Sequence, residues 1–318
     1  MKRIDFSETG ICDINWSPDG EWLTYVRVEK KDNTEISKIF KAKADGASPV
    51  EMAEGTSPSF NSDNDIIYEN GDEIYLNNQG NSTLLISKSD IIGGTPKRKP
   101  KCSGDGKKLI FVIDNVFHKE SEARNAYPYR SFLGVADAGK RPHSQILANQ
   151  QWYGGTVTWF PDHETFLHYE FDSTGGARIH MSNLKGDKLG TIFGLLPSIS
   201  PDQKRLACKP KGGQSVVVYV SKAEQWDADD VETMVTKLPE GGRLSGSPPI
   251  WLDNRFVLID EAGKLFRVDT RKQEAEEYKK IPAPVLRGTY TMVSSPARDR
   301  LAAEIETDGG FELHVFSL

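Results

Sequence analysis

The sequence has little cysteine, and its cysteines are widely spaced. Cys12, Cys102 and Cys208 are the only three, and no two of them stand in the C-x-x-C spacing of zinc or redox motifs. The small number also excludes a dense disulfide framework of the kind that small secreted domains use. We therefore expect buried free thiols, since unpaired cysteine is among the most buried residue types.

A long apolar run and an excess of positive charge are also missing. No stretch reaches the about 20 apolar residues of a membrane-spanning helix, and Asp5 and Glu8 interrupt the region where an export signal would be apolar. The net charge of −6 disfavours nucleic acid as a partner. We expect a soluble chain without a transmembrane segment, cytoplasmic as the sequence stands, or periplasmic if an export signal has been cut away.

Recognised catalytic motifs are missing as well. The chain has no G-x-S-x-G elbow, H-E-x-x-H motif, P-loop or dinucleotide fingerprint, and its six histidines are scattered. His168, Glu170 and His180 fall on two adjoining expected strands, where they could form half of a metal or acid/base site. Hydrogen-bonded structural histidines are the simpler interpretation. The sequence therefore predicts no catalytic residue, no metal ligand and no cofactor.

What the sequence does contain is a repeat. Its clearest copy is WSPDG at residues 16–20, which precedes an apolar strand, and the seven copies begin at positions 16, 60, 102, 159, 199, 251 and 294. The steps between copies are 44, 42, 57, 40, 52 and 43 residues, which are typical of four-stranded propeller blades. Strands with alternating apolar residues then follow polar or Gly-rich turns. The pattern predicts an all-β, seven-bladed β-propeller, with a six-bladed ring as the lesser alternative.

The two ends of the chain indicate how this ring closes. The last repeat has no room for a fourth strand before Leu318, while residues 2–7 precede the first repeat and have an extended pattern. We expect residues 2–7 to form the outer strand of the last blade, which protects the edges that an open array would expose. Residues 1–318 are then expected to be one domain, and the protein a monomer.

The aspartates of the repeat invite a functional interpretation, but turn formation explains them better. Proline presets the first central position of the turn, aspartate tolerates the second, and glycine takes a positive φ. A cation site would need clustered carboxylates, whereas these lie in separate blades. The residues are Asp19, Asp63, Asp105, Asp162 and Asp202.

The W-S-P-D-G signature, carried letter for letter by residues 16–20 and in degraded form by the other copies, resembles the TolB-type propeller repeat, a relative of the WD-repeat. This resemblance spans the whole chain and implies the propeller fold. It leaves the activity open, because such rings serve as docking modules, as gating domains of peptidases and as scaffolds of polysaccharide lyases. Our first hypothesis is a non-enzymatic protein that binds a protein, a peptide or a small anionic ligand at the channel face. The alternative is a polysaccharide lyase or another sugar-processing enzyme, similar to oligogalacturonate lyase.

Candidate ligand-binding residues lie where the repeat departs from its pattern. Lys97, Arg98 and Lys99 fall in an expected loop that enters the third blade, where they could hold a carboxylate or phosphate, or form an ordinary solvated charge run. The third repeat also carries an insertion at residues 115–132, which could bind a ligand or merely pack over the ring. The insertion and the neighbouring loops supply the other candidates: His118, Tyr127, Tyr129, Arg130, Trp152, Tyr153, Arg287 and Tyr290.

Overall fold

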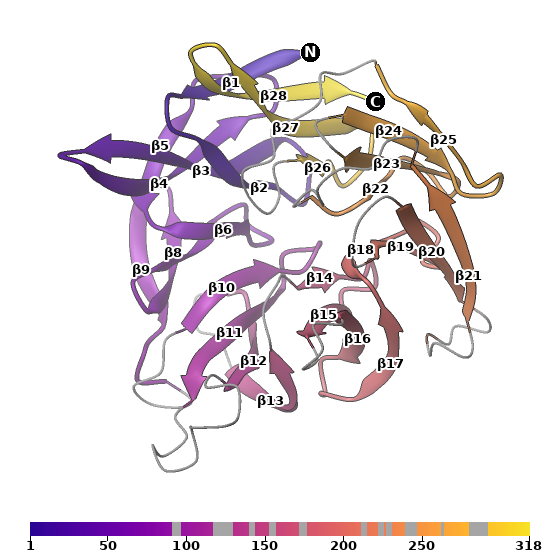
Figure 1. The fold of residues 1–318 in the computed structure, drawn as a ribbon. Helices are drawn as coiled ribbons and strands as arrows, with labels where there is room; N and C mark the ends of the chain where they lie inside the picture. Colours follow the sequence, from indigo (N-terminus) through magenta and orange to yellow (C-terminus); the bar gives the residue numbers. More distant parts are fainter. Residues whose placement is uncertain are drawn as a thin grey trace.

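The structure is a computed structural model that describes residues 1–90, 97–116, 130–139, 144–152, 157–171, 177–210, 215–221, 226, 231–238, 247–261, 264–279 and 292–318. These residues form 28 β-strands and no helix. The strands make seven four-stranded antiparallel sheets arranged in a ring, and we call the central axis of this ring, along which the inner strands lie, the channel (Figure 1). The predicted all-β, seven-bladed propeller is confirmed.

Each sheet is one blade, and in blades 1 to 6 the four strands follow one another outward from the channel. Blades 1 and 2 contain β2 (Ile11–Trp16), β3 (Trp22–Lys31), β4 (Thr34–Lys43), β5 (Val50–Glu54), and β6 (Thr56–Phe60), β7 (Ile66–Asn70), β8 (Glu73–Asn78), β9 (Asn81–Ile86). Blades 3 and 4 contain β10 (Lys97–Cys102), β11 (Lys108–Val116), β12 (Arg130–Asp137), β13 (Ser144–Trp152), and β14 (Thr158–Trp159), β15 (Thr165–Phe171), β16 (Ala177–Asn183), β17 (Lys188–Phe193). Blades 5 and 6 contain β18 (Leu195–Ile199), β19 (Arg205–Lys209), β20 (Ser215–Ser221), β21 (Val231–Lys237), and β22 (Ile250–Trp251), β23 (Phe256–Glu261), β24 (Lys264–Asp269), β25 (Glu274–Glu277).

Blade 7 joins the two ends of the chain. It contains β26 (Met292–Ser294), β27 (Arg300–Thr307) and β28 (Gly310–Ser317), and its outer strand is β1 (Lys2–Ser7). Strand β1 pairs antiparallel with β28, so that Phe6 lies opposite Glu312. The expected closure by residues 2–7 is confirmed.

The first residue of every repeat copy is the last residue of an inner strand, as Trp16 is of β2. The turn that follows is held by side chains: Ser17 Oγ donates to Asp19 Oδ1 at 2.5 Å, and Asp19 Oδ1 also accepts the backbone N–H of Glu21 at 2.9 Å. Gly20 has a φ of 72°, as the turn requires. Asp19 is therefore a turn residue, as predicted.

Tryptophan at the start of the repeat links neighbouring blades. The indole Nε1 of Trp16 donates to the carbonyl of Val293 at 3.2 Å, that of Trp159 to Lys101 at 3.1 Å, and that of Trp251 to Ser198 at 2.9 Å. Each acceptor lies on the inner strand of the preceding blade. The repeated tryptophan therefore fixes the spacing of the blades around the channel.

The core is divided among the blade interfaces. The described buried apolar residues form seven clusters, and each cluster lies between two neighbouring blades. The cluster between blades 7 and 1 contains Ile4 of the closing strand together with Ile14 and Leu313. Both faces of each sheet are therefore buried, which explains why the second strands are apolar almost throughout.

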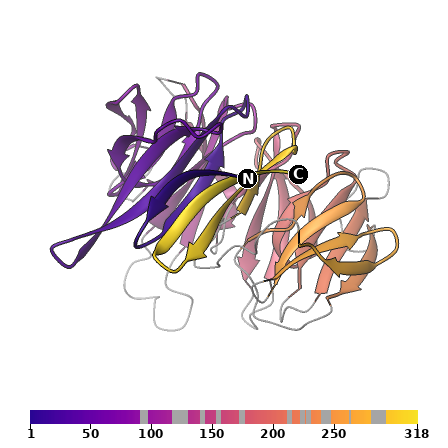
Figure 2. The same ribbon diagram turned by 90° about the horizontal axis from the view of Figure 1, so that it is seen from above.

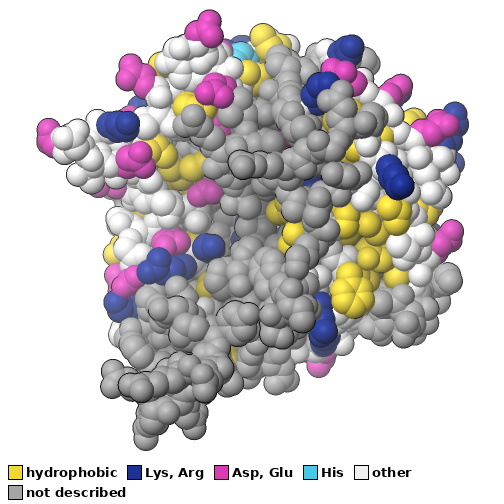
Figure 3. All heavy atoms as spheres, viewed as in Figure 1, with side chains coloured by type: hydrophobic (Ala, Val, Ile, Leu, Met, Phe, Trp, Pro, Cys, Tyr) yellow, Lys and Arg dark blue, Asp and Glu magenta, His cyan; other side chains and the backbone are white. Residues whose placement is uncertain are grey.

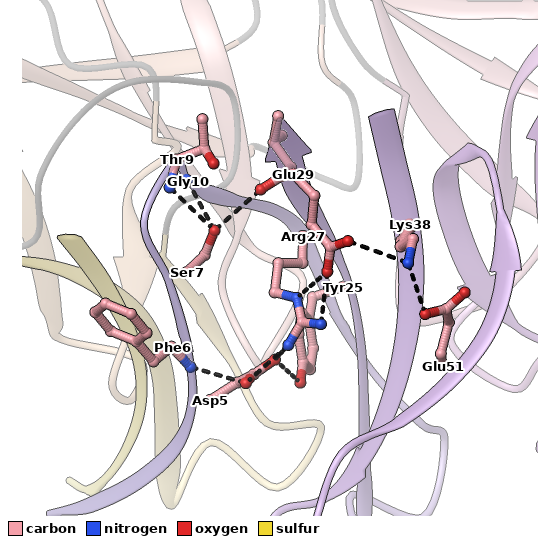
Figure 4. Close-up of polar contacts among 11 residues, drawn as sticks. Asp5, Phe6, Ser7, Thr9, Gly10, Tyr25, Arg27, Glu29, Lys38 and Glu51 are labelled. Carbon is pink, nitrogen blue, oxygen red and sulfur yellow. Dashed lines mark hydrogen bonds and ion pairs between the residues drawn. The ribbon is translucent and has the colours of Figure 1, made fainter. Parts of the chain in front are cut away.

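Polar contacts tie the closing strand to blade 1 (Figure 4). Tyr25 donates its hydroxyl hydrogen to Asp5 Oδ2 at 2.7 Å, and Arg27 Nη1 lies 3.4 Å from Asp5 Oδ1. Arg27 also pairs with Glu29 at 2.7 Å, and Lys38 lies 3.1 Å from Glu29. We call Asp5, Tyr25 and Arg27 the closure cluster, because they join β1 of blade 7 to β3 of blade 1.

Two faces of the ring can now be distinguished. The repeat turns lie on one, which we call the turn face. The loops that enter the inner strands lie on the other, which we call the mouth face and which Figures 1 and 3 view. The β3–β4 hairpin extends from the ring on the mouth side (Figure 2) and turns through Asp32 and Asn33, whose φ values are 50° and 62°.

Candidate binding site at the mouth of the channel

The inner strands share a distortion near the mouth face. The pairing register slips in β2, β6, β10 and β18. In each of these strands, the residue three positions before the repeat start has a left-handed backbone: Asp13, Ser57, Lys99 and Leu196, with φ values of 51°, 52°, 52° and 53°. Left-handed conformations are unfavourable for residues other than glycine and concentrate at functional positions. This ring of bulges therefore marks the mouth as a candidate site.

The residue after each bulge is buried, and it is proline in three cases, Pro58, Pro100 and Pro197. Proline has no N–H to leave unpaired where the ladder is interrupted. The side chains at the bulge and two residues later are then available to the channel. Asn15 and Lys101 demonstrate this, because Lys101 Nζ on blade 3 donates to Asn15 Oδ1 on blade 1, across the inner strand of blade 2.

Carboxylates accept the N–H groups that the bulges expose. Asp13 Oδ2 accepts the N–H of Ser57 at 3.1 Å, and Glu69 Oε2 accepts the N–H of Lys99 at 2.9 Å. Burial raises the pKa of Glu69, although the N–H of Lys99 and the charge of Arg98 oppose this. The backbone N–H groups at these two bulges are therefore hydrogen-bonded to carboxylates rather than to solvent.

Asp13 and Lys101 are two ionisable groups at the mouth whose pKa values are shifted by burial. Burial raises the pKa of the Asp13 carboxyl group, while the N–H of Ser57 and the charges of Lys101 and Lys99 oppose the shift. Burial also lowers the pKa of the Lys101 ammonium group, against the charge of Asp13. Perturbed acids and bases in close company are a recognised mark of functional sites.

The basic run predicted to lie in an entering loop instead belongs to strand β10. Lys97 is completely buried, its Nζ lies 3.5 Å from the carbonyl of Lys88, and burial lowers its pKa. Arg98 lies 3.1 Å from Asp72 and 3.9 Å from Glu69. Lys99 alone is exposed. The run therefore forms a strand whose three cations have different surroundings. Successive side chains of a strand point to opposite faces, so residues that are neighbours in sequence differ in burial.

The remaining predicted site residues are not placed by the structure. Arg130 begins β12 and Trp152 ends β13, but their side chains lie outside the described part. His118, Tyr127, Tyr129, Tyr153, Arg287 and Tyr290 lie outside the described residues altogether.

Sequence reasoning missed Asp13, Asn15 and Lys101. The available signal was their spacing, since each stands one or three positions before a repeat start. Of the two interpretations of His168 and His180, hydrogen-bonded structural residues fit the structure better than half of a metal or acid/base site. His168 lies 3.3 Å from Ser182 Oγ, and His180 lies 3.0 Å from Thr191 Oγ1. Among the described residues, no group of three His, Cys, Asp or Glu side chains converges as a metal site would.

The three cysteines match the expected buried free thiols, except that Cys12 is only half-buried. Cys102 and Cys208 are buried, Cys12 is half-buried, and all three are free thiols. Burial raises the pKa of both Cys12 and Cys102 to about 12. These thiols are therefore protonated at neutral pH and are poor nucleophiles.

Arg298 lies at the opposite end of the channel. It occupies the glycine position of the blade 7 turn, with a φ of 60°, and its Nη2 donates to the carbonyl of Ile199 on blade 5 at 3.3 Å. The turn of blade 6 between them is shortened, because Leu252 N–H bonds directly to the carbonyl of Phe256. The guanidinium group therefore links the turn ends of blades 7 and 5 past the short turn of blade 6.

Solved structures of other proteins share this architecture. An oligogalacturonate lyase in complex with manganese matches with a TM-score of 0.60 and 13% identity over 99% of this chain and 90% of that one. The acylaminoacyl peptidase of Pyrococcus horikoshii matches with a TM-score of 0.61 and 14% identity over 99% of this chain, which spans 53% of the peptidase. TolB from Acinetobacter baumannii matches with a TM-score of 0.47 and 16% identity over 85% and 63%.

What the first two matches establish is the fold. The chain is a β-propeller. No family model and no curated protein sequence matches it. No helix in the described segments of this propeller is long and apolar enough to cross a membrane.

Proposed function

We propose that the protein is a non-enzymatic, TolB-type propeller that binds the anionic group of a small molecule, a peptide or a protein at the mouth of its channel. The observation that carries this proposal is the position of Lys99 and Lys101. Lys99 is the bulge residue of β10 and Lys101 stands two residues later, where its Nζ donates to Asn15 Oδ1 of blade 1 past the inner strand of blade 2. Charge-assisted hydrogen bonds to a carboxylate or phosphate are stronger in such a partly desolvated site than in water.

Three cationic side chains of β10 lie on this side of the mouth: Arg98, Lys99 and Lys101. Arg98 lies 3.1 Å from Asp72 and 3.9 Å from Glu69, so its charge is already balanced by carboxylates. The charges of Lys101 and Lys99 both act on the Asp13 carboxyl group, and the charge of Asp13 acts on Lys101. An anionic ligand would meet these cations on one strand, although the chain as a whole has a net charge of −6.

The proposal is tested by titrating the protein calorimetrically with acetate, citrate, phosphate and a mixture of acidic peptides. We expect at least one of these anions to bind, and Lys101→Met to weaken its binding about tenfold or more, as loss of a charge-assisted hydrogen bond implies. Lys107→Met is the matched control, because Lys107 lies on the turn face with its side chain 71% exposed. Unchanged binding in Lys101→Met, and in a triple variant with alanine at positions 97 to 99, would overturn the proposal.

A second candidate function is sugar processing by a lyase. The observation that favours it is the pair of Asp13 and Lys101, whose pKa values burial shifts toward each other, as general acids and bases require. In a lyase, a base removes a proton next to a carboxylate that a cation neutralises. The test is incubation with pectic oligomers, with ultraviolet absorbance of an unsaturated product as the readout and metal analysis of the purified protein alongside. An absence of product with and without added divalent metal would remove this candidate.

A further inference from the structure

The glycine position of the repeat turn has a left-handed backbone in six of the seven turns, all of which lie within the described residues. Glycine adopts this conformation without steric cost, whereas a Cβ atom makes it unfavourable. Blades 1 and 3 have Gly20 and Gly106 at this position, but blade 7 has Arg298, with a φ of 60°. Since the turn itself is best made by glycine, the arginine must be explained by what its side chain does.

Within the protein, the side chain of Arg298 does little. Its Nη2 donates to the carbonyl of Ile199 on blade 5 at 3.3 Å, and among the residues that the structure describes this is its only hydrogen bond. In the same part of the chain it forms no ion pair. Burial lowers the pKa of its guanidinium group, although the charge of Asp202 opposes the shift. A guanidinium group has five N–H donors, so most of those of Arg298 remain for another acceptor.

The carboxylates nearest to this arginine are already engaged with other groups. Asp202 Oδ2 accepts a hydrogen bond from Arg205 Nη1 at 2.9 Å. Asp299, which follows Arg298 in the sequence, lies 3.6 Å from the side chain of Arg300. Neither carboxylate therefore serves as the counter-ion of Arg298.

Other polar side chains on the turn face are better satisfied. Asn64, at the same repeat position on blade 2, donates to the carboxylate of Asp19 at 2.7 Å. Arg300 donates to the carbonyl of Gly20 at 2.7 Å. Arg298 has only its long bond to a neutral carbonyl, while its guanidinium group is half-buried and its backbone is left-handed. Partial burial of a charge is unfavourable unless the charge is paired, so the described contacts do not offset these costs.

We propose that Arg298 binds the carboxylate of a small molecule at the turn face, in a site separate from that at the mouth. The parallel N–H groups of a guanidinium group match the two oxygens of a carboxylate. The negative charge of Asp202 nearby disfavours a second charge on the ligand, so a carboxylate fits this site better than a dianionic phosphate. The half-buried position of the arginine favours a small molecule over the surface of a folded protein.

The experiment is an NMR titration of the intact protein with sodium acetate, sodium phosphate and sodium chloride at pH 7.5. The readouts are the Nε–H signal of Arg298 and the backbone N–H signals of residues 199–204. We expect acetate to shift these signals to saturation, and to bind at least about tenfold more tightly to the native protein than to Arg298→Gln, as loss of a charge-assisted hydrogen bond implies. Phosphate should bind more weakly than acetate. Arg271→Gln is the matched control, because Arg271 is an exposed arginine of the turn between β24 and β25.

Arg298→Gly separates binding from packing. Because glycine adopts the left-handed backbone freely, this variant should unfold at a temperature no lower than that of the native protein when no carboxylate is present. Acetate should raise the unfolding temperature of the native protein and not that of the variant, since a ligand stabilises only the state that binds it.

The outcomes decide between a binding site and a structural link. Equal affinity of acetate for the native protein and Arg298→Gln, or equal shifts with sodium chloride, would overturn the inference. A lower unfolding temperature for Arg298→Gly, with no response of the native protein to acetate, would show that Arg298 only joins blades 7 and 5. Acetate binding that persists in Lys101→Met but not in Arg298→Gln supports the turn-face site. The reverse result would overturn it and leave the function proposed for the mouth standing.

Discussion

Glu304 Oε1 accepts a hydrogen bond from the backbone N–H of Ile11 at 3.0 Å, which joins β27 of blade 7 to the inner strand of blade 1. Glu69 Oε2 likewise accepts a backbone N–H from the next blade, that of Lys99, which is itself a bulge residue, whereas Ile11 lies two residues before the bulge at Asp13. In both blades, the glutamate lies three residues after the first residue of the second strand that pairs with the inner strand. The relationship shows how a ring of β-sheets can interrupt its inner ladders and still satisfy the backbone.

We predict that this acceptor is a requirement for stability. Glu304→Leu should lower the free energy of unfolding by about 2 kcal/mol, since a buried N–H left unpaired costs its desolvation. Glu304→Gln, which retains an acceptor oxygen, should cost less. Urea denaturation measures both, with Glu306→Gln on the exposed end of β27 as the control. Equal losses for leucine and glutamine would show that the acceptor is not what matters.

The repeat turns allow a test in which the backbone is the same and only the neighbours differ. Gly20 and Gly106 have φ values of 72° and 70°. An added Cβ at Gly20 would meet the flexible end of Arg300 at 3.3 Å, whereas at Gly106 it would meet the backbone of Asn61 and Ser62 at 2.3 Å.

We therefore expect Gly20→Ala to cost about 1 kcal/mol, the usual penalty for a left-handed backbone. Gly106→Ala should cost about 3 kcal/mol, because overpacking adds to that penalty. Thermal and urea unfolding of the two variants provide the comparison. A cost for Gly106→Ala no larger than that for Gly20→Ala would mean that the turns of blades 2 and 3 are not packed as closely as the structure has them.

Much of this architecture was predictable, and the reason is repetition. Trp16 and Asp19 act through local geometry that recurs, in complete or degraded form, every 40 to 57 residues, so the sequence reveals both the fold and their roles. Asp13 and Lys101 act through a bulge whose position depends on pairing between strands. Proline follows three of the four bulges, but no residue type by itself announces one. The burial of Lys97 could not be predicted either, because a run of cationic residues does not indicate which side chains point into the protein once the run forms a strand.

His168 leads to a prediction about pH. Burial lowers its pKa to about 3, with smaller contributions from His180 and Lys188, whereas an unfolded histidine titrates at about 6.5. Below the unfolded value, the unfolded chain binds a proton that the folded chain does not. The stability that neutral His168 contributes is therefore complete above about pH 6.5 and is lost as the pH falls toward 3.

Between these values we expect the contribution of His168 to fall by about 1.4 kcal/mol for each unit of pH. The measurement is the free energy of unfolding from pH 4 to 7 for the native protein and for His168→Gln, whose side chain does not titrate. The slope should be shallower in the variant, whatever its absolute stability. His163→Gln, in the turn of blade 4, is the control. Parallel slopes for the native protein and His168→Gln would contradict the prediction.

The closure cluster should stabilise the closed ring at blade 7, where the two ends of the chain meet. Tyr25 and Arg27 both contact Asp5, whose side chain is 10% exposed, and these bonds reinforce the pairing of β1 with β28. Tyr25→Phe should lower the free energy of unfolding by about 1 to 2 kcal/mol, as loss of a hydrogen bond to a charged acceptor does. Because both partners lie in one network, Asp5→Ala combined with Tyr25→Phe should cost less than the two single changes added together.

Local opening separates closure from general stability. If the cluster ties down β1, amide hydrogen exchange of residues 2–7 should speed up in Asp5→Ala more than exchange in β20, in the distant blade 5. Arg3→Ala is the matched control, since Arg3 belongs to the same strand but pairs with Glu312 through a side chain that is 57% exposed. Uniform acceleration in β1 and β20 would mean that Asp5 contributes to the stability of the whole ring and not to its closure.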